Sequence, residues 1–224
     1  MTPGIPGTSG SPKASDPLMR QATSPDRIGQ QIAFLAEADK LKLILRRTPL
    51  IDLSRRENSA EHSWHLILTA MIVREHVGAD VDLMRVLEML AIHDLIEIDA
   101  GDTFAYDFKG QATKAERERA GAERVFGILP DDQRAYLRQL WDEFEAQETI
   151  EARFAHSVDR LQPLIVNASC GGGSWINQNL TQEDILRRMA PIETALPTLW
   201  PFVTQTIDRY CAAGVLAKSP SRTR

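Results

Sequence analysis

Apolar residues recur at steps of three and four along most of the chain, and this period limits the chain to helices that each bury one face. No stretch of useful length alternates apolar and polar residues as a half-buried strand does. The sequence therefore predicts a single all-α domain, a bundle of six or seven helices. Three of these helices are expected at residues 60–77, 81–98 and 150–168, the last kinked or restarted at Pro163.

The two ends of the chain differ in composition from its middle. Residues 1–25 are rich in Gly, Pro, Ser and Thr, and such a segment buries too little apolar surface to offset the entropy of ordering it. The closing residues, AKSPSRTR, have the same polar character. We therefore expect a disordered leader at 1–25, a folded domain at 26–214 and a disordered tail at 215–224.

Bulk composition argues against several classes of protein. A net charge of -5 leaves no dominant basic field, so duplex nucleic acid is not expected as a partner. The longest apolar runs fall well short of the roughly 20 residues that span a bilayer, so no membrane partner is expected either. Cys170 and Cys211 form no C-x-x-C pair and are expected to be reduced, which predicts a cytoplasmic protein.

An adjacent histidine and aspartate, His93 and Asp94, lie within the apolar run LAIHDLI. A carboxylate rarely enters a protein core without a partner that compensates its charge. A divalent metal ion compensates it directly, and imidazole nitrogen together with carboxylate oxygen suits Zn, Mn, Fe or Co. The pair therefore predicts a metal site on the helix at 81–98.

Two ligands do not hold a metal ion, so others must come from other helices. His62 is the best third candidate, because its helix can face the helix of His93 across a short connection. Asp159 is the fourth, since it lies where helix 150–168 should carry an apolar stripe. Asp159 could instead pair with Arg153 or Arg160 on its own helix.

The order of these residues, H…HD…D, resembles that of the HD-domain metal-dependent phosphohydrolase superfamily. The segments ENSAEHSWH, IHDLIEIDAGD, LPDDQRAYLRQLWDEFE and ARFAHSVDRLQPL are similar to those of its 5′-deoxynucleotidase branch, over about residues 28–212. The resemblance implies an HD-domain helical bundle that removes the 5′-phosphate from (deoxy)nucleoside monophosphates, giving nucleoside and phosphate. It also implies a homodimer, as relatives commonly are.

The resemblance further implies one divalent metal ion (Mn, Co, Zn, Fe or Mg) with open positions for water and a phosphate oxygen. Its ligands would be His62, His93, Asp94 and Asp159. The superfamily pattern needs no other histidine, so His65 is assigned to packing and His156 to an exposed position.

Two acidic residues after the HD pair are the implied catalytic groups. Glu97 would take or relay the proton of the attacking water, and Asp102 would lie at the substrate and that water. Both could instead hold a second metal ion. From the residues alone a further alternative remains, a helix end at which Asp99 and Asp102 satisfy backbone amides around Gly101.

Substrate binding is expected in the loop after the first long helix. Arg47 matches the arginine that contacts the nucleotide in the family, with Arg46 as the alternative, and a guanidinium grips phosphate oxygens two at a time. Thr48 stands where some bacterial relatives carry a tryptophan that packs on the sugar. The choice between deoxyribose and ribose therefore stays open.

Three other functions remain as alternatives. A di-iron oxygenase of the same superfamily would use additional histidines, and none lies between residues 94 and 155. A non-enzymatic helical metal-binding module would have a closed site without spare acids such as Glu97 and Asp102. An HD-domain phosphohydrolase of another nucleotide, such as a triphosphate, would need more basic residues. A metal-content assay combined with an activity screen would separate enzyme from module.

Overall fold

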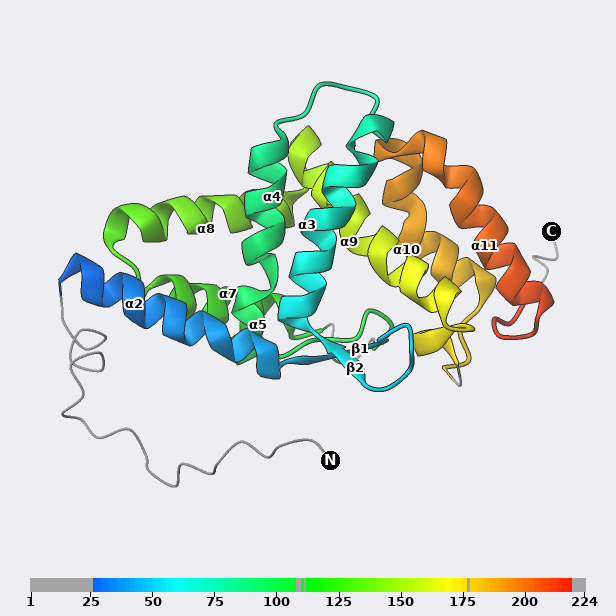
Figure 1. Ribbon diagram of the computed structural model, residues 1–224, viewed down its shortest axis with the longest axis horizontal. Coiled ribbons are helices and arrows are strands. Elements are labelled where there is room, and N and C mark those ends of the chain that lie inside the picture. The colour runs from blue at the N-terminus through cyan, green and yellow to red at the C-terminus, as the bar shows by residue number, and fades with distance from the viewer. Residues whose placement is uncertain (1–25, 108–109, 111, 177, 219–224) are drawn as a thin grey trace, which may run out of the picture.

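The computed structural model describes residues 26–107, 110, 112–176 and 178–218, so the predicted leader and residues 219–224 of the predicted tail lie outside it. The described part is mostly helical, with one short two-stranded hairpin (Figure 1). Its α-helices are α2 (Arg27–Ala38), α3 (Ser59–Val73), α4 (Leu83–Ile92), α5 (Glu97–Ala100), α7 (Lys114–Phe126), α8 (Asp131–Ala146), α9 (Ile150–Ser169), α10 (Gln182–Ala195) and α11 (Trp200–Ala212). Its 3₁₀ turns are η1 (Asp39–Leu43), η2 (Arg74–His76), η3 (His93–Ile96), η4 (Gly173–Trp175) and η5 (Pro197–Leu199).

The prediction of an all-α chain with six or seven helices needs correction on two points. Within the described ranges, eight helices are ten or more residues long. The strands β1 (Leu45–Pro49) and β2 (Arg56–Asn58) pair antiparallel. The sequence pattern missed them because so short a pair shows no alternation, and β1 carries two arginines and a proline.

The predicted helix at 81–98 is divided in the structure. α4 ends at Ile92, the HD pair opens the 3₁₀ turn η3, and α5 begins at Glu97. Apolar periodicity does not distinguish a tightened turn from an α-helix within a buried run. The division places the two residues of the predicted metal site at a junction of elements.

Two prolines lie inside continuous helices, and at one of them, Pro163, the sequence predicts a kink or a restart. α9 continues through Pro163 to Ser169, and α10 continues through Pro191 to Ala195. A proline inside a helix removes one backbone hydrogen bond, which is the basis of the predicted break. The two helices pack on each other and bury Leu161, Leu164 and Ile192 completely or nearly so, and this packing outweighs the lost bonds.

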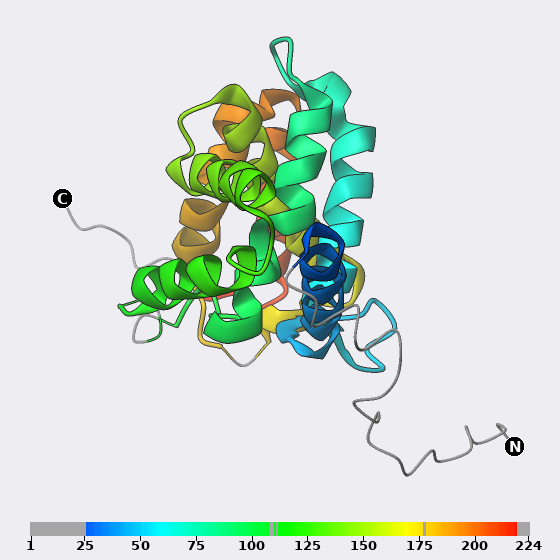
Figure 2. The same cartoon turned by 90° about the vertical axis from the view of Figure 1, so that its left-hand side faces the viewer.

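Helix α9 is the centre of the fold, and α3, α4, α8 and α10 pack around it (Figure 1). A second hydrophobic cluster lies where α2, α5 and α7 meet, built on residues such as Phe34 and Phe126. Figure 2 shows α2 nearly end-on, with α7 and α8 to one side of it. The turn η3 lies between the two clusters, since Leu90 before it belongs to the first and Leu95 within it to the second.

The packed part continues beyond the domain boundary expected at 214. Leu216 is buried in the main cluster. The backbone of Ala217 donates to Leu180 O at 2.9 Å and accepts from Gln182 N at 2.9 Å. Cys170 and Cys211 are buried and unpaired. Among the described residues, no helix combines the length and the apolar character needed to cross a bilayer.

Candidate active site

Four side chains predicted as metal ligands converge from three elements: His62 from α3, His93 and Asp94 from η3, and Asp159 from α9. His62 Nε2 lies 2.9 Å from Asp159 Oδ1. His93 Nε2 lies 3.0 Å from Asp94 Oδ1 and 4.0 Å from Asp159 Oδ1. The ligand atoms of His62, His93 and Asp94 all lie within 4.8 Å of one another, and all three residues are buried.

The two imidazole rings are oriented for a cation. His62 Nδ1 lies 3.0 Å from Gln162 Oε1, and His93 Nδ1 lies 3.0 Å from the carbonyl oxygen of Leu90. Each Nδ1 therefore donates its proton outward, and each Nε2 points at the carboxylates, where a metal ion would take the place of a proton on the nitrogen. His93 Nε2 is buried and makes no hydrogen bond within the described part of the chain. An unpaired buried nitrogen beside carboxylates fits a divalent metal ion, so the cluster can hold one.

Arg46 of β1 adjoins this cluster. Its Nη1 donates to Asp94 Oδ2 at 2.8 Å, and its Nε lies 3.9 Å from Glu57 Oε2. The side chain of Arg46 is only 14% exposed, so its charge acts with little screening by solvent. Arg46 thus orients Asp94 and offsets part of the negative charge of the site.

Charge interactions keep the carboxylates of Asp94 and Asp159 ionised against the cost of burial. Burial raises the pKa of Asp94, but His93 and Arg46 outweigh it and hold that pKa below its usual range. For Asp159 burial is likewise outweighed, chiefly by the hydrogen bond to His62, and the pKa lies well below the usual value. Burial and Arg46 lower the pKa of His62, whereas Asp159 and Glu57 raise it to about 9. The cluster is thus matched to a positive charge.

The two predicted catalytic acids have pKa values shifted in the opposite direction. Glu97, at the start of α5, is 6% exposed, and Ser59 Oγ donates to its Oε2 at 2.7 Å. Burial and then the charge of Asp94 raise the pKa of Glu97 well above its usual value. Burial also raises the pKa of Asp102. A carboxyl that binds a proton readily beside a metal-ligand cluster is suited to general acid–base chemistry.

The alternative interpretation of this segment, a helix end stabilised by its own aspartates, finds little support. Asp99 instead forms an ion pair with Arg124 of α7. The backbone N–H of Gly101 donates to Glu97 O at 2.8 Å, and Gly101 has a φ of 71°. The glycine therefore ends α5 through the backbone.

Two adjoining cavities lie beside the cluster. The first, called here the metal-side cavity, has a volume of about 200 Å³ and is lined by His93, Asp94 and Glu97 among others. The second, the aromatic cavity, has a volume of about 90 Å³ and is lined by rings that include Phe104 and Trp175. The residues that line both cavities mark their junction, and they are Arg46, Asp102, Thr103, Ala105, Asp159, Arg160 and Arg188.

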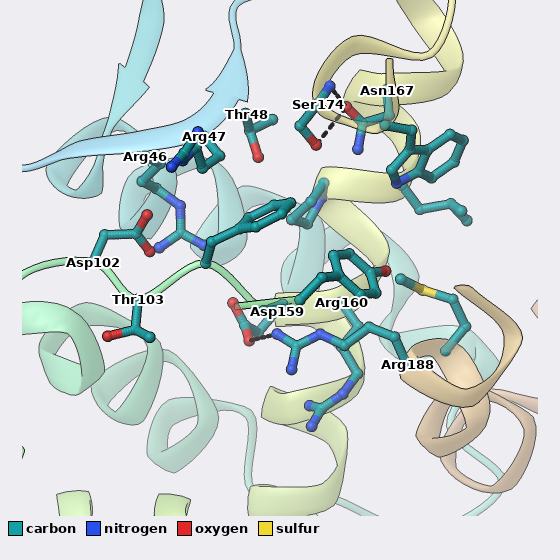
Figure 3. Close-up of a pocket in the computed structure, with 17 residues that line it drawn as sticks. Arg46, Arg47, Thr48, Asp102, Thr103, Asp159, Arg160, Asn167, Ser174 and Arg188 are labelled. Carbon is teal, nitrogen blue, oxygen red and sulfur yellow. Dashed lines mark hydrogen bonds and ion pairs between the residues drawn. The ribbon is translucent and has the colours of Figure 1, made fainter. Parts of the chain in front are cut away.

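The aromatic cavity contains both predicted substrate-binding residues (Figure 3). The guanidinium of Arg47 lies 5.6 Å from the ring centre of Phe104, and Thr48 is buried. Asn167 is 2% exposed, and its Oδ1 accepts from the backbone and the hydroxyl of Ser174 at 2.8 and 3.2 Å. Its amide Nδ2 makes no hydrogen bond within the described residues. The cavity therefore combines ring faces with hydrogen-bonding groups.

His156 differs from its prediction. It was expected to be exposed, but it is 7% exposed and stacks on Phe144 at 4.0 Å between ring centres. Its Nε2 lies 2.7 Å from Phe144 O, and its Nδ1 accepts from Arg160 Nη1 at 2.8 Å. Burial and the charge of Arg160 lower the pKa of His156 to about 3, so the ring is neutral. Because α9 is surrounded by other helices, its periodicity alone does not show which positions face solvent.

Two arginines at the candidate site are not predicted by the sequence. Arg160 is expected there only as an ion-pair partner for Asp159, and no role is expected for Arg188. Both line the junction of the two cavities. The position of Arg160 directly after the predicted ligand Asp159 is the sequence signal that places it near the site. Nothing in the local sequence of Arg188 distinguishes it from Arg187.

Comparison with known proteins gives consistent findings. A family model described as "HD domain" matches residues 38–200. The human 5′-deoxynucleotidase HDDC2 is 27% identical over 140 residues, covering 62% of this chain and 66% of that protein. This chain thus spans just under two thirds of that relative's length. A 5′-deoxynucleotidase of Klebsiella pneumoniae is 29% identical over 126 residues, covering 53% of this chain and 63% of that protein.

Solved structures also match. A structure described as a "Predicted metal-dependent phosphohydrolase" from Magnetospirillum magnetotacticum is 46% identical, with a TM-score of 0.80, over 85% of this chain and 98% of that one. A conserved hypothetical protein from Pyrococcus furiosus, 21% identical with a TM-score of 0.58, covers 80% of this chain and 99% of that one and supports the fold alone.

Proposed function

This chain belongs to the HD domain family of phosphohydrolases, and we propose that it removes the 5′-phosphate from nucleoside monophosphates, deoxynucleotides included. One observation carries the proposal: a buried cluster fit for a metal ion lies beside a cavity lined by aromatic rings and hydrogen-bonding groups. A phosphomonoester bound across the junction would place its phosphate near the cluster and its nucleoside among the rings. The names of the human and Klebsiella relatives support the same substrate class.

The metal ligands in this proposal are His62, His93, Asp94 and Asp159. When bound, a divalent ion would polarise a phosphoryl oxygen and make a nearby water more acidic. Gln162 and the carbonyl of Leu90 hold the two imidazoles in the tautomer that presents Nε2.

Glu97 is the proposed general base. The hydrogen bond from Ser59 orients its carboxylate, and its raised pKa makes it a stronger proton acceptor than an ordinary glutamate. Asp102, which lies at the junction of the cavities, is proposed to supply a proton to the leaving 5′-oxygen directly or through water. A second metal ion held by Glu97 and Asp102 is the alternative use of these two acids.

Arg47 and Thr48 are the proposed nucleotide-binding residues of β1. Arg47 lies over Phe104, so it can act on a base or sugar stacked in the aromatic cavity as well as on phosphate. Thr48 is buried at the edge of that cavity and presents a small polar group. We expect the cavity beside Thr48 to accept ribose as well as deoxyribose.

The test is phosphate release from deoxy- and ribonucleoside 5′-monophosphates with Mn²⁺, Co²⁺ or Mg²⁺. Wild type would be compared with Asp94→Asn and Glu97→Ala, and Asp99→Asn serves as a matched control because Asp99 pairs with Arg124 instead. Metal-dependent release that is lost in the first two variants and kept in the third supports the proposal. No release from any monophosphate by metal-loaded wild type would refute it.

The same assay addresses the alternatives. Nucleoside triphosphates in a parallel set of reactions would reveal an HD-domain phosphohydrolase of another nucleotide. Stoichiometric metal without hydrolysis of any nucleotide would favour a non-enzymatic metal-binding module.

A further inference from the structure

Two arginines outside the predicted site meet at the junction of the cavities. Arg160 follows Asp159 on α9, and Arg188 comes from α10, which the sequence places far from the other site residues. Figure 3 shows Arg46 and Arg188 on opposite sides of Asp159. Three guanidinium groups from three elements therefore surround one space between the predicted metal ligands and the aromatic rings.

The hydrogen-bonding capacity of Arg188 is unused within the described part of the chain. Its closest carboxylate oxygen is Asp159 Oδ2, at 4.0 Å from Nη2, which is longer than a hydrogen bond. Its side chain is 37% exposed. Arg85 on α4 has a similarly covered side chain, 29% exposed, but its Nε donates to Glu143 Oε2 at 2.9 Å. A half-buried guanidinium normally has such a partner, so Arg188 is arranged for an anion that is not part of the protein.

Arg160 is only partly satisfied as well. Its hydrogen bonds to described residues all use Nη1, which donates to His156 Nδ1 and to the carbonyl of His156, both at 2.8 Å. Among the described residues, Nε and Nη2 make none, and no carboxylate lies within ion-pair distance. The neutral ring of His156 accepts from the guanidinium without neutralising its charge. His156 therefore positions Arg160 and leaves its positive charge available.

The two arginines lie close enough for their charges to act on each other, since Arg188 lowers the pKa of Arg160 after burial does, to about 10. Two guanidinium groups in proximity, without hydrogen-bonded carboxylates, are stabilised by an anion that both can contact. A phosphate dianion has the charge and the oxygen geometry that such a pair recognises.

We infer that Arg188, with Arg160 beside it, binds the phosphate group of the substrate from the side opposite Arg46. The identity of the ester rests on the proposed function, whereas the anion site rests on the arginines themselves. The arrangement favours a phosphomonoester, which is a dianion, over a phosphodiester, which carries a single charge and a second bulky substituent. It also predicts that the inorganic phosphate product binds at the same place.

The experiment is a calorimetric titration of inorganic phosphate into the full chain loaded with one equivalent of Mn²⁺. Arg188→Met should weaken phosphate binding about tenfold or more, because a charge-assisted pair of hydrogen bonds is lost. Arg188→Lys keeps the charge without the planar fork and should lose less. Arg187→Met is the matched control. Arg187 is the exposed neighbour of Arg188 and lies near Glu183 and Asp184, so its replacement should leave phosphate affinity unchanged.

Nucleotide kinetics on the same variants separate this inference from the proposed function. The inference is supported if Arg188→Met and Arg160→Met show a raised KM for the monophosphate and weakened phosphate binding. Their Mn²⁺ content should equal that of wild type. Phosphate binding that depends on Arg188 without hydrolysis of any nucleotide keeps the inference and removes the proposed function. The inference alone is overturned if wild type hydrolyses a nucleotide but wild type, Arg188→Met and Arg188→Lys bind phosphate equally well. It is also overturned if wild type binds no phosphate.

Discussion

Three acidic side chains of the candidate site each have a specific partner. Asp94 has Arg46, Asp159 has His62, and Glu97 has the hydroxyl of Ser59. The partners differ in charge, and this difference separates the pKa values of the acids. Asp94 and Asp159 are paired with cationic groups and stay ionised, whereas Glu97 lies beside the negative charge of Asp94 and retains its proton more easily. Neighbouring carboxyl groups can therefore be assigned different roles.

Glu97→Gln should lower kcat on a nucleoside monophosphate by about 10²- to 10⁴-fold, because the amide cannot accept the proton. The metal content should stay that of wild type, since Glu97 is not one of the proposed ligands. Elemental analysis alongside kinetics checks both statements. Loss of metal together with activity would instead indicate that Glu97 is a ligand.

His156 should make the stability of the protein depend on pH. Its folded-state pKa of about 3 lies below the ordinary value of 6.5, so the unfolded chain takes up the proton first as pH falls. The free energy of unfolding should thus decrease as pH falls from 6.5 toward 3, by up to about 1.4 kcal/mol per pH unit from this group. The contribution of the neutral His156 ring to the free energy of unfolding is fully present above pH 6.5.

His156→Gln provides the comparison, because an amide can donate to Phe144 O and accept from Arg160 without titrating. Urea unfolding of both proteins between pH 7 and about 4.5 should give a shallower pH dependence for the variant. Parallel curves would show that His156 does not contribute as described.

At the scale of elements, the HD turn depends on the close approach of a helix. Gly121 of α7 lies against η3, and a Cβ at this position would meet the carbonyl oxygen of Ile96 at 2.7 Å. The backbone of a packed turn cannot move aside as a flexible side chain can. The glycine therefore permits α7 to support the turn that carries His93 and Asp94.

Gly121→Ala should destabilise the fold by about 1–3 kcal/mol and weaken metal binding, because η3 must shift. Gly78→Ala is the control: no atom lies within 4 Å of a Cβ there, so little change is expected. Thermal unfolding and Mn²⁺ titration measure the two effects. A Gly121→Ala protein with wild-type stability would contradict the proposed close packing.

Across the whole molecule, the metal site connects helices that are distant in the sequence. The proposed ligands come from α3, η3 and α9, so a bound ion links both hydrophobic clusters through η3. Binding to the folded chain alone stabilises it by mass action. The expected homodimer stays a prediction at this scale, and a mass measurement in solution tests it.

Removal of the metal ion by a chelator should lower the Tm of wild type by roughly 5–10 °C, as expected for an ion present at about 100 times its Kd. Asp94→Asn, which lacks one proposed ligand, should show a much smaller shift under the same conditions. Calorimetry with and without chelator makes the comparison. An equal shift in both proteins would place the stabilising ion elsewhere.

Local pattern predicted a mostly helical chain and a buried His93–Asp94 pair, because period and residue type along one helix report directly on burial. The roles of Glu97 and Asp102 were implied by the family resemblance and stay predictions. The structure brings His62 and Asp159 together with the His93–Asp94 pair, as the order of the residues suggested. The hairpin and the 3₁₀ turn at His93 could not be predicted from the sequence, since both depend on a few residues held by neighbouring elements.

Tertiary packing alone decided which face of α9 is covered and which arginines reach the site. His156 is buried because Phe144 of α8 stacks on its ring, and Arg188 approaches Asp159 because α10 packs on α9. A helix pattern states that a face is apolar, but it does not identify the partner of that face. The amino-acid sequence therefore determined the types and order of the proposed ligands, whereas the packing of helices determined the charges that surround them.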